Sequence, residues 1–272
     1  MSYISINFQL HKEDEAKILV TDLALQRGYG IFDFLKTIDN RIIFKDNHFD
    51  RFYNSAKELN LNIDFSREEL HHAIVQLMEK NNTPNSGIKF ILTGGYSEDG
   101  YTMAKPNLVI TQVPFEIAKN GLQNGMKLVT YNHQRQLASI KTIDYLQAIR
   151  LQSFIKENDA NDVLYHDNGY LRECPRANFF IVKGNKVLTA KTNILKGITR
   201  SKVLLLNNET LSVEEQDITL EDLSEATEAF ITSSTKNIWP ILAVDGKVIG
   251  DGKTGKITTL LHDQLLQVIH NQ

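Results

Sequence analysis

Four short stretches of the sequence carry side chains that can do chemistry. Lysine and histidine can act as nucleophiles or bases, carboxylates as acids, and arginine and hydroxyl groups as ligands for an anion. Each stretch is weak evidence alone, because the same residue types are common on protein surfaces. The stretches are His48-Phe49-Asp50-Arg51-Phe52, Ser139-Ile140-Lys141-Thr142-Ile143-Asp144-Tyr145, Glu173-Cys174-Pro175-Arg176-Ala177-Asn178 and Leu195-Lys196-Gly197-Ile198-Thr199-Arg200.

The last of these stretches contains a candidate phosphate site. Gly197-Ile198-Thr199 is expected to open a helix, whose first amides are unpaired and lie at the positive end of the helix dipole. A helix cap without a ligand is the simpler interpretation of so short a segment. The hydroxyl cluster Thr232-Ser233-Ser234-Thr235 and the helical Arg51 could also hold a phosphate, or each could be an ordinary surface polar group.

Several other catalytic classes lack their usual patterns. The histidines include the pair His71 and His72, but the sequence has no His-Glu-x-x-His, no Cys-x-x-Cys and no clustered carboxylate loop, so we expect no metal site. No Gly-x-Ser-x-Gly, P-loop or Gly-x-Gly-x-x-Gly pattern follows an expected strand. Hydrolase, nucleoside triphosphatase and dinucleotide-binding functions therefore lose their usual signals.

Taken together and in order, these motifs resemble the class IV, or fold-type IV, pyridoxal-phosphate aminotransferases. This family includes branched-chain and D-amino-acid aminotransferases and aminodeoxychorismate lyase. The resemblance spans nearly the whole chain. Its marks are Arg27-Gly28-Tyr29-Gly30, His48 to Arg51, Lys141 with Tyr145, Glu173 with Asn178, Gly197-Ile198-Thr199-Arg200, Thr232-Ser233-Ser234 and Asp245-Gly246-Lys247.

The resemblance implies pyridoxal 5'-phosphate as cofactor and a role for each matching residue. Lys141 stands at the position of the Schiff-base lysine, which also shuttles the substrate proton. Glu173 matches the glutamate that keeps the pyridine nitrogen protonated, so that the ring can accept electrons. Tyr145 matches the tyrosine that hydrogen-bonds the phenolic oxygen of the cofactor. The phosphate-binding positions fall on Arg51, Ile198, Thr199, Ser233 and Ser234.

The sequence departs from the family pattern where substrate is bound. Lys36 stands where many relatives have a glutamate, and Gly94 to Gly100 lacks the Arg-x-His pair that binds substrate carboxylate in familiar D-amino-acid aminotransferases. Arg176 occupies a position where the family usually has glycine or serine. Its guanidinium can bind a carboxylate or form a structural ion pair. Arg27 and, less strongly, Lys89 can add positive charge, so these three are the expected substrate-binding residues.

The predicted activity is transfer of an amino group between an amino acid and a 2-keto acid. A basic pocket favours D-alanine and D-glutamate over the apolar substrates leucine and valine. A branched-chain L-amino-acid aminotransferase is the first alternative. Aminodeoxychorismate lyase, which would use the same Lys141 and Glu173, is the second. A noncatalytic cofactor-binding protein is disfavoured because both residues are present.

The elements that must position these residues mix strands and helices. Alternation from Tyr3 to Phe8 and apolar runs at residues 31–35, 41–44, 87–93 and 107–113 predict strands, while residues 46–59 and 66–80 have helical spacing. The second half combines hairpins with helices at residues 144–157, 199–206 and 256–270. The fold class predicted is α+β, and the resemblance implies two α/β subdomains with mixed and antiparallel sheets.

A connection near residue 120 divides the chain, because residues 114–125 contain Pro, Asn and Gly and show no clear period. We therefore expect a small N-terminal subdomain, residues 1–120, and a larger cofactor-binding subdomain, residues 121–272. The resemblance implies that the cofactor lies at their junction. It also implies a homodimer, in which each site receives loops from the neighbouring subunit.

Composition excludes several partners. The 272 residues carry 30 Lys and Arg against 33 Asp and Glu, without long charge runs, so nucleic-acid binding has no footprint. No apolar stretch reaches the roughly 18 residues of a membrane span. The single cysteine, Cys174, suits a reducing compartment, and we expect a cytoplasmic protein without membrane contact.

Overall fold

The computed structural model describes residues 2–115, 122–207 and 210–272. The chain divides into two compact units: Met1–Ile117 with Ile140–Asp144, and Ala118–Ser139 with Tyr145–Gln272. The boundary predicted near residue 120 falls among residues 116–121, outside the described residues. The segment Ile140–Asp144, which contains Lys141, groups with the first unit although it follows that boundary in the chain. The predicted α+β class with mixed and antiparallel sheets is confirmed.

The first unit contains a six-stranded sheet in the order β2-β1-β6-β5-β3-β4. Every strand pair in it is antiparallel. The first strand ends at Ile6 and not at Phe8 as the alternation predicted, because Asn7 and Phe8 adopt positive φ angles and turn the chain into β2. The strands are β1 (Tyr3–Ile6), β2 (Gln9–Lys12), β3 (Gly30–Ile38), β4 (Arg41–Ile42), β5 (Ser86–Thr93) and β6 (Leu108–Pro114).

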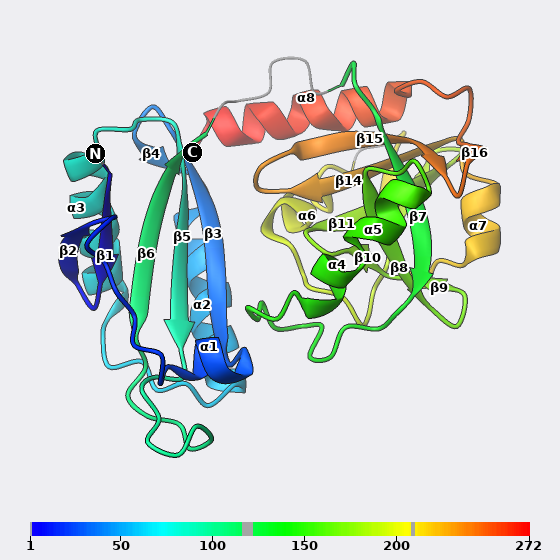
Figure 1. The fold of residues 1–272 in the computed structure, drawn as a ribbon. Coiled ribbons are helices and arrows are strands. Elements are labelled where there is room, and N and C mark those ends of the chain that lie inside the picture. Colours follow the sequence, from blue (N-terminus) through cyan, green and yellow to red (C-terminus); the bar gives the residue numbers. More distant parts are fainter. Residues whose placement is uncertain (1, 116–121, 208–209) are drawn as a thin grey trace. The chain divides into compact units, whose positions relative to one another are not determined.

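Two helices, α2 (Lys45–Glu58) and α3 (Arg67–Asn81), lie against the same face of this sheet, as Figure 1 shows. The short α1 (Leu23–Arg27) precedes β3. Successive strand residues point to opposite faces, so one face of the sheet can be apolar throughout. That face and the helices form a core that includes Ile31, Leu35, Phe49, Phe52, Leu70, Ile74, Ile88, Phe90 and Ile110.

The second unit contains a ten-stranded mixed sheet. Its main path runs β13-β12-β11-β14-β15-β7-β8-β9, with β10 paired to β11 and β16 paired to β15. The pairs β7–β8, β15–β7 and β12–β13 are parallel. The strands are β7 (Met126–Asn132), β8 (Asp162–Asp167), β9 (Tyr170–Leu171), β10 (Glu173–Cys174), β11 (Ala177–Lys183), β12 (Lys186–Thr189), β13 (Ser212–Glu215), β14 (Glu228–Ser233), β15 (Asn237–Val244) and β16 (Lys247–Val248).

The helices of the second unit, among the residues that the structure describes, are α4 (Leu146–Arg150), α5 (Gln152–Glu157), α6 (Ile198–Val203), α7 (Leu220–Ser224) and α8 (Lys256–His270). The single helix predicted over residues 144–157 is two helices that meet at Leu151. The long α8 lies along β14 and β15 (Figure 1) and buries Leu261, Leu265 and Ile269 at its 3.6-residue period. Among the described residues, no helix is long and apolar enough to cross a membrane.

Candidate active site

Lys141 lies on a short segment that extends the sheet of the first unit beyond β3. The amide of Phe32 donates to the Lys141 carbonyl at 3.0 Å, and the amide of Ile143 donates to the Gly30 carbonyl at 3.1 Å. A Cβ atom at residue 30 would lie 2.8 Å from the carbonyl oxygen of Leu92 in β5. The close approach of β3 and β5 at this point therefore requires glycine. The half-buried Lys141 places its Nζ 4.5 Å from the centre of the Phe32 ring.

Arg51 is held by a buried carboxylate that the sequence analysis did not single out. Its Nε donates to Asp33 Oδ2 at 2.8 Å and a terminal nitrogen donates to Asp33 Oδ1 at 2.7 Å. His48 Nδ1 lies 2.8 Å from the same Oδ1. Asp33 is fully buried, and Arg51 lies on α2, one turn after His48. Because Asp33 joins β3 to α2, it fixes which way the Arg51 guanidinium points.

The charges around Asp33 shift two pKa values. Burial alone would raise the pKa of Asp33, but Arg51 and His48 together hold it well below its ordinary value. Burial lowers the pKa of His48, and the attraction of Asp33 does not overcome that effect. Nearby Arg51 and Lys141 lower it further. The His48 ring is therefore neutral near pH 7 and donates from Nδ1 to an ionised Asp33.

The position of Asp33 in its strand was a signal that sequence reasoning missed. Asp33 lies between Ile31 and Leu35 in the alternation, on the face that packs against α2. A charged residue in the buried phase of a strand requires a partner, because an unpaired buried charge is strongly unfavourable. The helical motif His48 to Arg51 supplied two candidates for that partner.

Glu173 is a buried carboxylate surrounded by donors in the second unit. Arg135 donates to its Oε1 at 2.9 Å, Asn178 donates to Oε2 at 3.2 Å, and the amide of Leu195 lies 3.1 Å from both oxygens. Glu173 is 4% exposed. Because β10 pairs Glu173 with Asn178 and Cys174 with Ala177, the five-residue spacing in the motif is the register of a tight hairpin.

Arg135 could not be found from the sequence. It lies in a loop, 38 residues before Glu173 in the chain, and no local period or motif links the two. Its guanidinium also donates to the Ala138 carbonyl, so the loop and the carboxylate are held by the same side chain.

Asn178 connects Glu173 to the predicted phosphate-binding residues. Its Nδ2 also donates to the Leu195 carbonyl at 2.7 Å, and its Oδ1 accepts from the Gly197 amide at 3.2 Å. In the sheet Asn178 lies opposite Thr232, a residue that is 2% exposed and whose hydroxyl lacks a hydrogen-bond partner among the described residues. This region of the second unit therefore has an unsatisfied buried hydroxyl.

The predicted phosphate-binding residues of the second unit lie in α6 and at the end of β14, where Ser234 follows the last strand residue, Ser233. These two elements pack together. Ile198 and Thr199 are buried in the first turn of α6, which has no side-chain cap at Gly197. Ser233 and Ser234 are half-buried, and the Ser233 hydroxyl accepts from the Lys236 amide. Asn178 links the start of α6 to the end of β14, because it accepts from the Gly197 amide and pairs with Thr232.

The predicted substrate-binding residues are exposed. Arg27 donates to the carbonyl of its neighbour Gln26, and Lys89 in β5 has its Nζ 5.7 Å from the Phe32 ring centre. Arg176 occupies the two-residue turn between β10 and β11, with a 74% exposed side chain that lies 3.9 Å from the Asp162 carboxylate. Arg27 and Lys89 belong to the first unit and Arg176 to the second.

Tyr145 completes the predicted set, and Lys36 marks a departure from the family pattern. Tyr145 is half-buried and precedes α4, and its carbonyl accepts from the Ile149 amide. Lys36, which stands at the usual glutamate position, is 4% exposed in β3, and burial lowers its pKa to about 8. Its ammonium therefore lies inside the first unit and not on an exposed surface.

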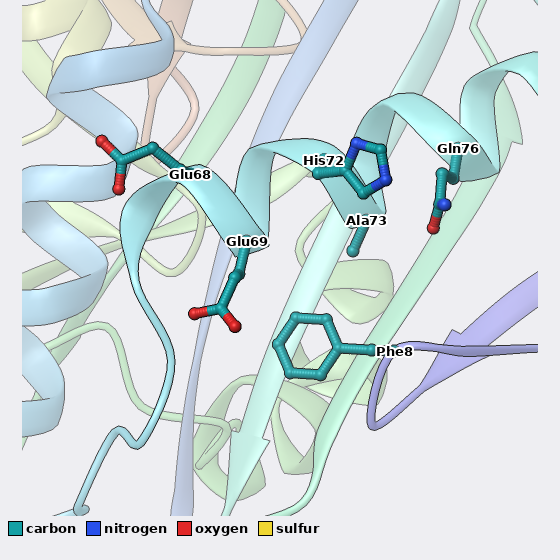
Figure 2. A pocket seen from close by; sticks show the side chains of 6 residues that line it. All are labelled: Phe8, Glu68, Glu69, His72, Ala73 and Gln76. Atoms are coloured by element: carbon teal, nitrogen blue, oxygen red, sulfur yellow. The ribbon is translucent and has the colours of Figure 1, made fainter.

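A surface pocket of about 430 Å³ lies elsewhere in the first unit, between α3 and the turn after β1 (Figure 2). It contains none of the predicted site residues. The Glu69 carboxylate in its wall already accepts from the Ser66 amide, which caps α3. The pocket is lined by Phe8, Glu68, Glu69, His72, Ala73 and Gln76.

In the described part of the chain, no group of three or more metal-binding side chains occurs.

Comparison with known proteins connects this geometry to one family. The family profile for amino-transferase class IV matches residues 30–244. The chain is 26% identical over 280 residues to the D-alanine aminotransferase of Staphylococcus haemolyticus, covering 100% of this chain and 99% of that protein. It is 29% identical over 279 residues to a putative branched-chain-amino-acid aminotransferase of Methanocaldococcus jannaschii, covering 97% and 96%.

Solved structures show the same fold. The branched-chain amino acid aminotransferase of Escherichia coli superposes with a TM-score of 0.87 at 24% identity, covering 98% of this chain and 94% of that one. Another branched-chain enzyme, solved with pyridoxamine 5'-phosphate, gives a TM-score of 0.91 at 22% identity, covering 99% and 94%. A putative 4-amino-4-deoxychorismate lyase from Legionella pneumophila gives 0.85 at 24% identity, covering 94% and 96%. The profile match extends over most of the chain, so the protein belongs to the class IV aminotransferase family, whose members use pyridoxal 5'-phosphate.

Proposed function

We propose that Lys141 is the residue that binds pyridoxal phosphate covalently and later moves the proton of the substrate. Two observations support this role. The segment that carries Lys141 is fixed to β3 by two backbone hydrogen bonds. The Lys141 amine lies 4.5 Å from the centre of the Phe32 ring, and this contact limits the rotamers of the lysine side chain. A lysine amine can form such a bond only in its uncharged form, so the surroundings of Lys141 govern its reactivity.

Glu173 is the proposed partner of the pyridine nitrogen. When bound, the cofactor supplies an electron sink for the carbanion that forms at the substrate. Glu173 holds a proton on the ring nitrogen, and its own orientation is fixed by Arg135, Asn178 and the Leu195 amide. A buried carboxylate held by several donors remains an acceptor with little freedom to rotate.

The phosphate is the proposed ligand of Arg51, Ile198, Thr199, Ser233 and Ser234, and Tyr145 is the proposed partner of the phenolic oxygen. Arg51 uses only part of its donor capacity on Asp33, because a guanidinium has five N–H groups. The Thr232 hydroxyl, which has no hydrogen-bond partner in the described part of the chain, and the start of α6, which has no side-chain cap, also fit a phosphate dianion. The residues present therefore fit this cofactor.

For the substrate, we propose D-amino acids, with D-alanine and D-glutamate preferred as donors and 2-keto acids as acceptors. The observation that carries this proposal is the exposed guanidinium of Arg176, which lies one tight turn from Glu173 and is only loosely associated with Asp162. Such a group is available to bind a carboxylate. Arg27 and Lys89 are the proposed additional cations. Several similar proteins are D-alanine aminotransferases, including that of Bacillus licheniformis at 28% identity.

Transfer between branched-chain L-amino acids and keto acids is the second candidate. The similarity to the Methanocaldococcus jannaschii protein and the close structural match to branched-chain enzymes favour it. Lyase chemistry on aminodeoxychorismate is the third, supported by the Legionella pneumophila structure. A homodimer in the cytoplasm is the proposed working form, and the single buried, unpaired Cys174 suits that compartment.

Borohydride reduction of the cofactor-loaded protein, followed by peptide mass mapping, tests the assignment of Lys141. We expect the adduct on the peptide that contains Lys141, and we expect Lys141→Ala to abolish transamination. Lys105→Met, which removes an 81% exposed lysine of the first unit, is the control and should retain activity. An adduct on any other lysine would reject the assignment.

A coupled donor screen with paired D and L isomers against pyruvate and 2-oxoglutarate tests the substrate proposal. Arg176→Ala should lower kcat/KM for D-glutamate by roughly ten- to a hundredfold, since a charge-assisted contact contributes about 1.5–3 kcal/mol. Faster turnover of L-leucine than of every D-substrate would overturn the D-specific proposal. Unchanged kinetics in Arg176→Ala would limit that residue to a structural role.

A further inference from the structure

The ammonium groups of two lysines of the first unit, Lys89 and Lys141, lie beside the same aromatic ring, that of Phe32. In the β3–β5 register Phe34 lies opposite Lys89, and Phe32 lies opposite Ile91. Because alternate residues share a face, the side chains of Phe32 and Lys89 project from the same face of the sheet. Lys141 reaches this face from the segment paired with the other edge of β3.

The distances place the two ammonium groups within electrostatic range. Lys141 Nζ lies 4.5 Å and Lys89 Nζ 5.7 Å from the Phe32 ring centre, so the two nitrogens are at most 10.2 Å apart, the sum of these distances. The screening length is about 8 Å at physiological salt. The upper bound is slightly longer than this physiological value but well within the roughly 30 Å that applies at 0.01 M salt, so the charge on Lys89 acts at Lys141 at low ionic strength, and salt and the solvent around the exposed Lys89 weaken the effect.

We propose that Lys89 is a positioning residue for Lys141: its permanent charge beside the shared Phe32 ring disfavours a second ammonium there and keeps the Lys141 amine uncharged and nucleophilic. This inference rests on the proposed role of Lys141 in holding the cofactor. It gives Lys89 a role in the reactivity of the enzyme itself, in addition to any contact with substrate.

Other charged and titratable groups in the first unit also contribute to the electrostatic potential in which Lys89 acts. On α2, Arg51 lies close enough to His48 to lower its pKa, as Lys141 does, and His48 itself is neutral near pH 7. On β3, the Asp33 charge is balanced by Arg51, and the Phe32 ring attracts either ammonium. The buried Lys36 alternates with Phe32 in β3, so it belongs to the same face of the sheet. Asp144 follows on the segment of Lys141. Changing only Lys89 leaves all of these groups in place.

The experiment measures the protonation of Lys141 directly in the full-length chain after the cofactor has been removed. Trace labelling with acetic anhydride across pH 6–11, with mass spectrometry of the Lys141 peptide, gives the pH at which half of this amine is uncharged. The variants are Lys89→Met, which removes the charge, Lys89→Glu, which reverses it, and Lys89→Arg, which retains it. Lys105→Met controls for a general loss of positive charge.

In Lys89→Met we expect the labelling midpoint of Lys141 to rise by about 0.3 to 1 pH unit. This range follows from a unit charge at this distance when the effective dielectric constant lies between that of water and that near a protein surface. The rise should be larger in Lys89→Glu, absent in Lys89→Arg and Lys105→Met, and smaller in 1 M salt. All three lysine-89 variants alter an exposed side chain, so folding should be retained.

An unchanged midpoint in Lys89→Met and Lys89→Glu would overturn the inference. If those variants changed only KM for carboxylate substrates, Lys89 would be a substrate-binding residue and the proposed function would stand. If the borohydride adduct fell on another lysine, the proposed function would fail whatever the midpoint of Lys141.

Discussion

At the scale of single residues, the orientation of Arg51 depends on a carboxylate that never reaches solvent. Asp33 is fully buried and accepts two hydrogen bonds from Arg51 and one from His48. The two side chains of α2 are thereby tied to β3. The proposed phosphate contact of Arg51 consequently depends on Asp33.

Replacing Asp33 with asparagine should destabilise the protein and make that loss dependent on pH. Removing one partner of a buried ion pair costs about 3–5 kcal/mol, because it leaves an uncompensated charge. Since the folded-state pKa of Asp33 lies below its ordinary value, its stabilising contribution is fully present above about pH 4 and is lost as pH falls through the folded-state value. Urea unfolding of wild type and variant at pH 7, 5 and 3 measures this.

The expected difference in the free energy of unfolding between wild type and Asp33→Asn is therefore large at pH 7 and 5 and smaller at pH 3. Asp50→Asn is the matched control, because Asp50 lies on the same helix with a 55% exposed carboxylate paired to Arg67. Surface pairs of this kind contribute about 0–1 kcal/mol. If the difference in the free energy of unfolding between wild type and Asp33→Asn did not change with pH, the charge of Asp33 would not be the source of this stability.

At the scale of elements, one amide side chain joins the β10–β11 hairpin to the loop before α6. Asn178 contacts Glu173, the Leu195 carbonyl and the Gly197 amide. These contacts relate the proposed pyridine-binding carboxylate to the proposed phosphate-binding turn. Asn178 therefore sets the spacing between the two ends of the proposed cofactor site in this unit.

Gly197→Ala should disrupt this connection. A Cβ at residue 197 would lie 2.2 Å from Asn178 Oδ1, and Asn178 cannot move without losing hydrogen bonds to Glu173 and Leu195. A lost buried hydrogen bond costs about 1–3 kcal/mol, so we expect cofactor affinity to fall roughly ten- to a hundredfold. Absorbance titration of the cofactor-free protein with pyridoxal phosphate measures the affinity.

The control for this variant is Gly184→Asn, in the turn between β11 and β12. Gly184 has a φ of 62°, which asparagine tolerates, and open space around its Cα. Affinity should be unchanged there. Wild-type affinity in Gly197→Ala would mean that Asn178 does not link the two ends of the site.

At the scale of the whole molecule, exposed apolar side chains of the first unit are candidates for the interface of the proposed homodimer. Exposed side chains occur before and within α1 and in the loop after β5, and the amide of Ser97 bonds the Thr21 carbonyl, which brings the two segments together. Exposed apolar patches commonly mark protein interfaces. The exposed apolar side chains of these two segments, called the α1 patch, are Leu19, Val20, Leu25, Tyr101 and Met103.

The proposed homodimer predicts a particle of about 62 kDa in sedimentation equilibrium, twice the chain mass of 31.0 kDa. If the α1 patch is buried in it, Leu25→Asp should shift the protein toward monomer and reduce activity, because a buried unpaired charge opposes association. Val248→Asp alters an equally exposed apolar residue of β16 and should leave the dimer intact. A fully active wild-type monomer would reject a shared site.

Much of the local structure was predictable from the sequence. The 3.6-residue period gave α2, α3 and α8, the apolar runs gave β3, β5 and β6, and the Ser66 to Glu69 pattern gave the start of α3. The turn after Ile6 and the break at Leu151 were missed, because a positive φ at Asn7 and Phe8 or a helix interruption leaves no period to detect.

By itself, the sequence determined the chemical groups available and their order: Lys141, Glu173, Asn178 and the hydroxyls that mark the class IV family. Only the tertiary structure decided which groups meet. Arg135 reaches Glu173 across 38 residues, Asp33 orients Arg51, and Lys89 shares a ring with Lys141. Such pairs depend on strand register and on the path of the chain between distant elements, and a local pattern of residues encodes neither.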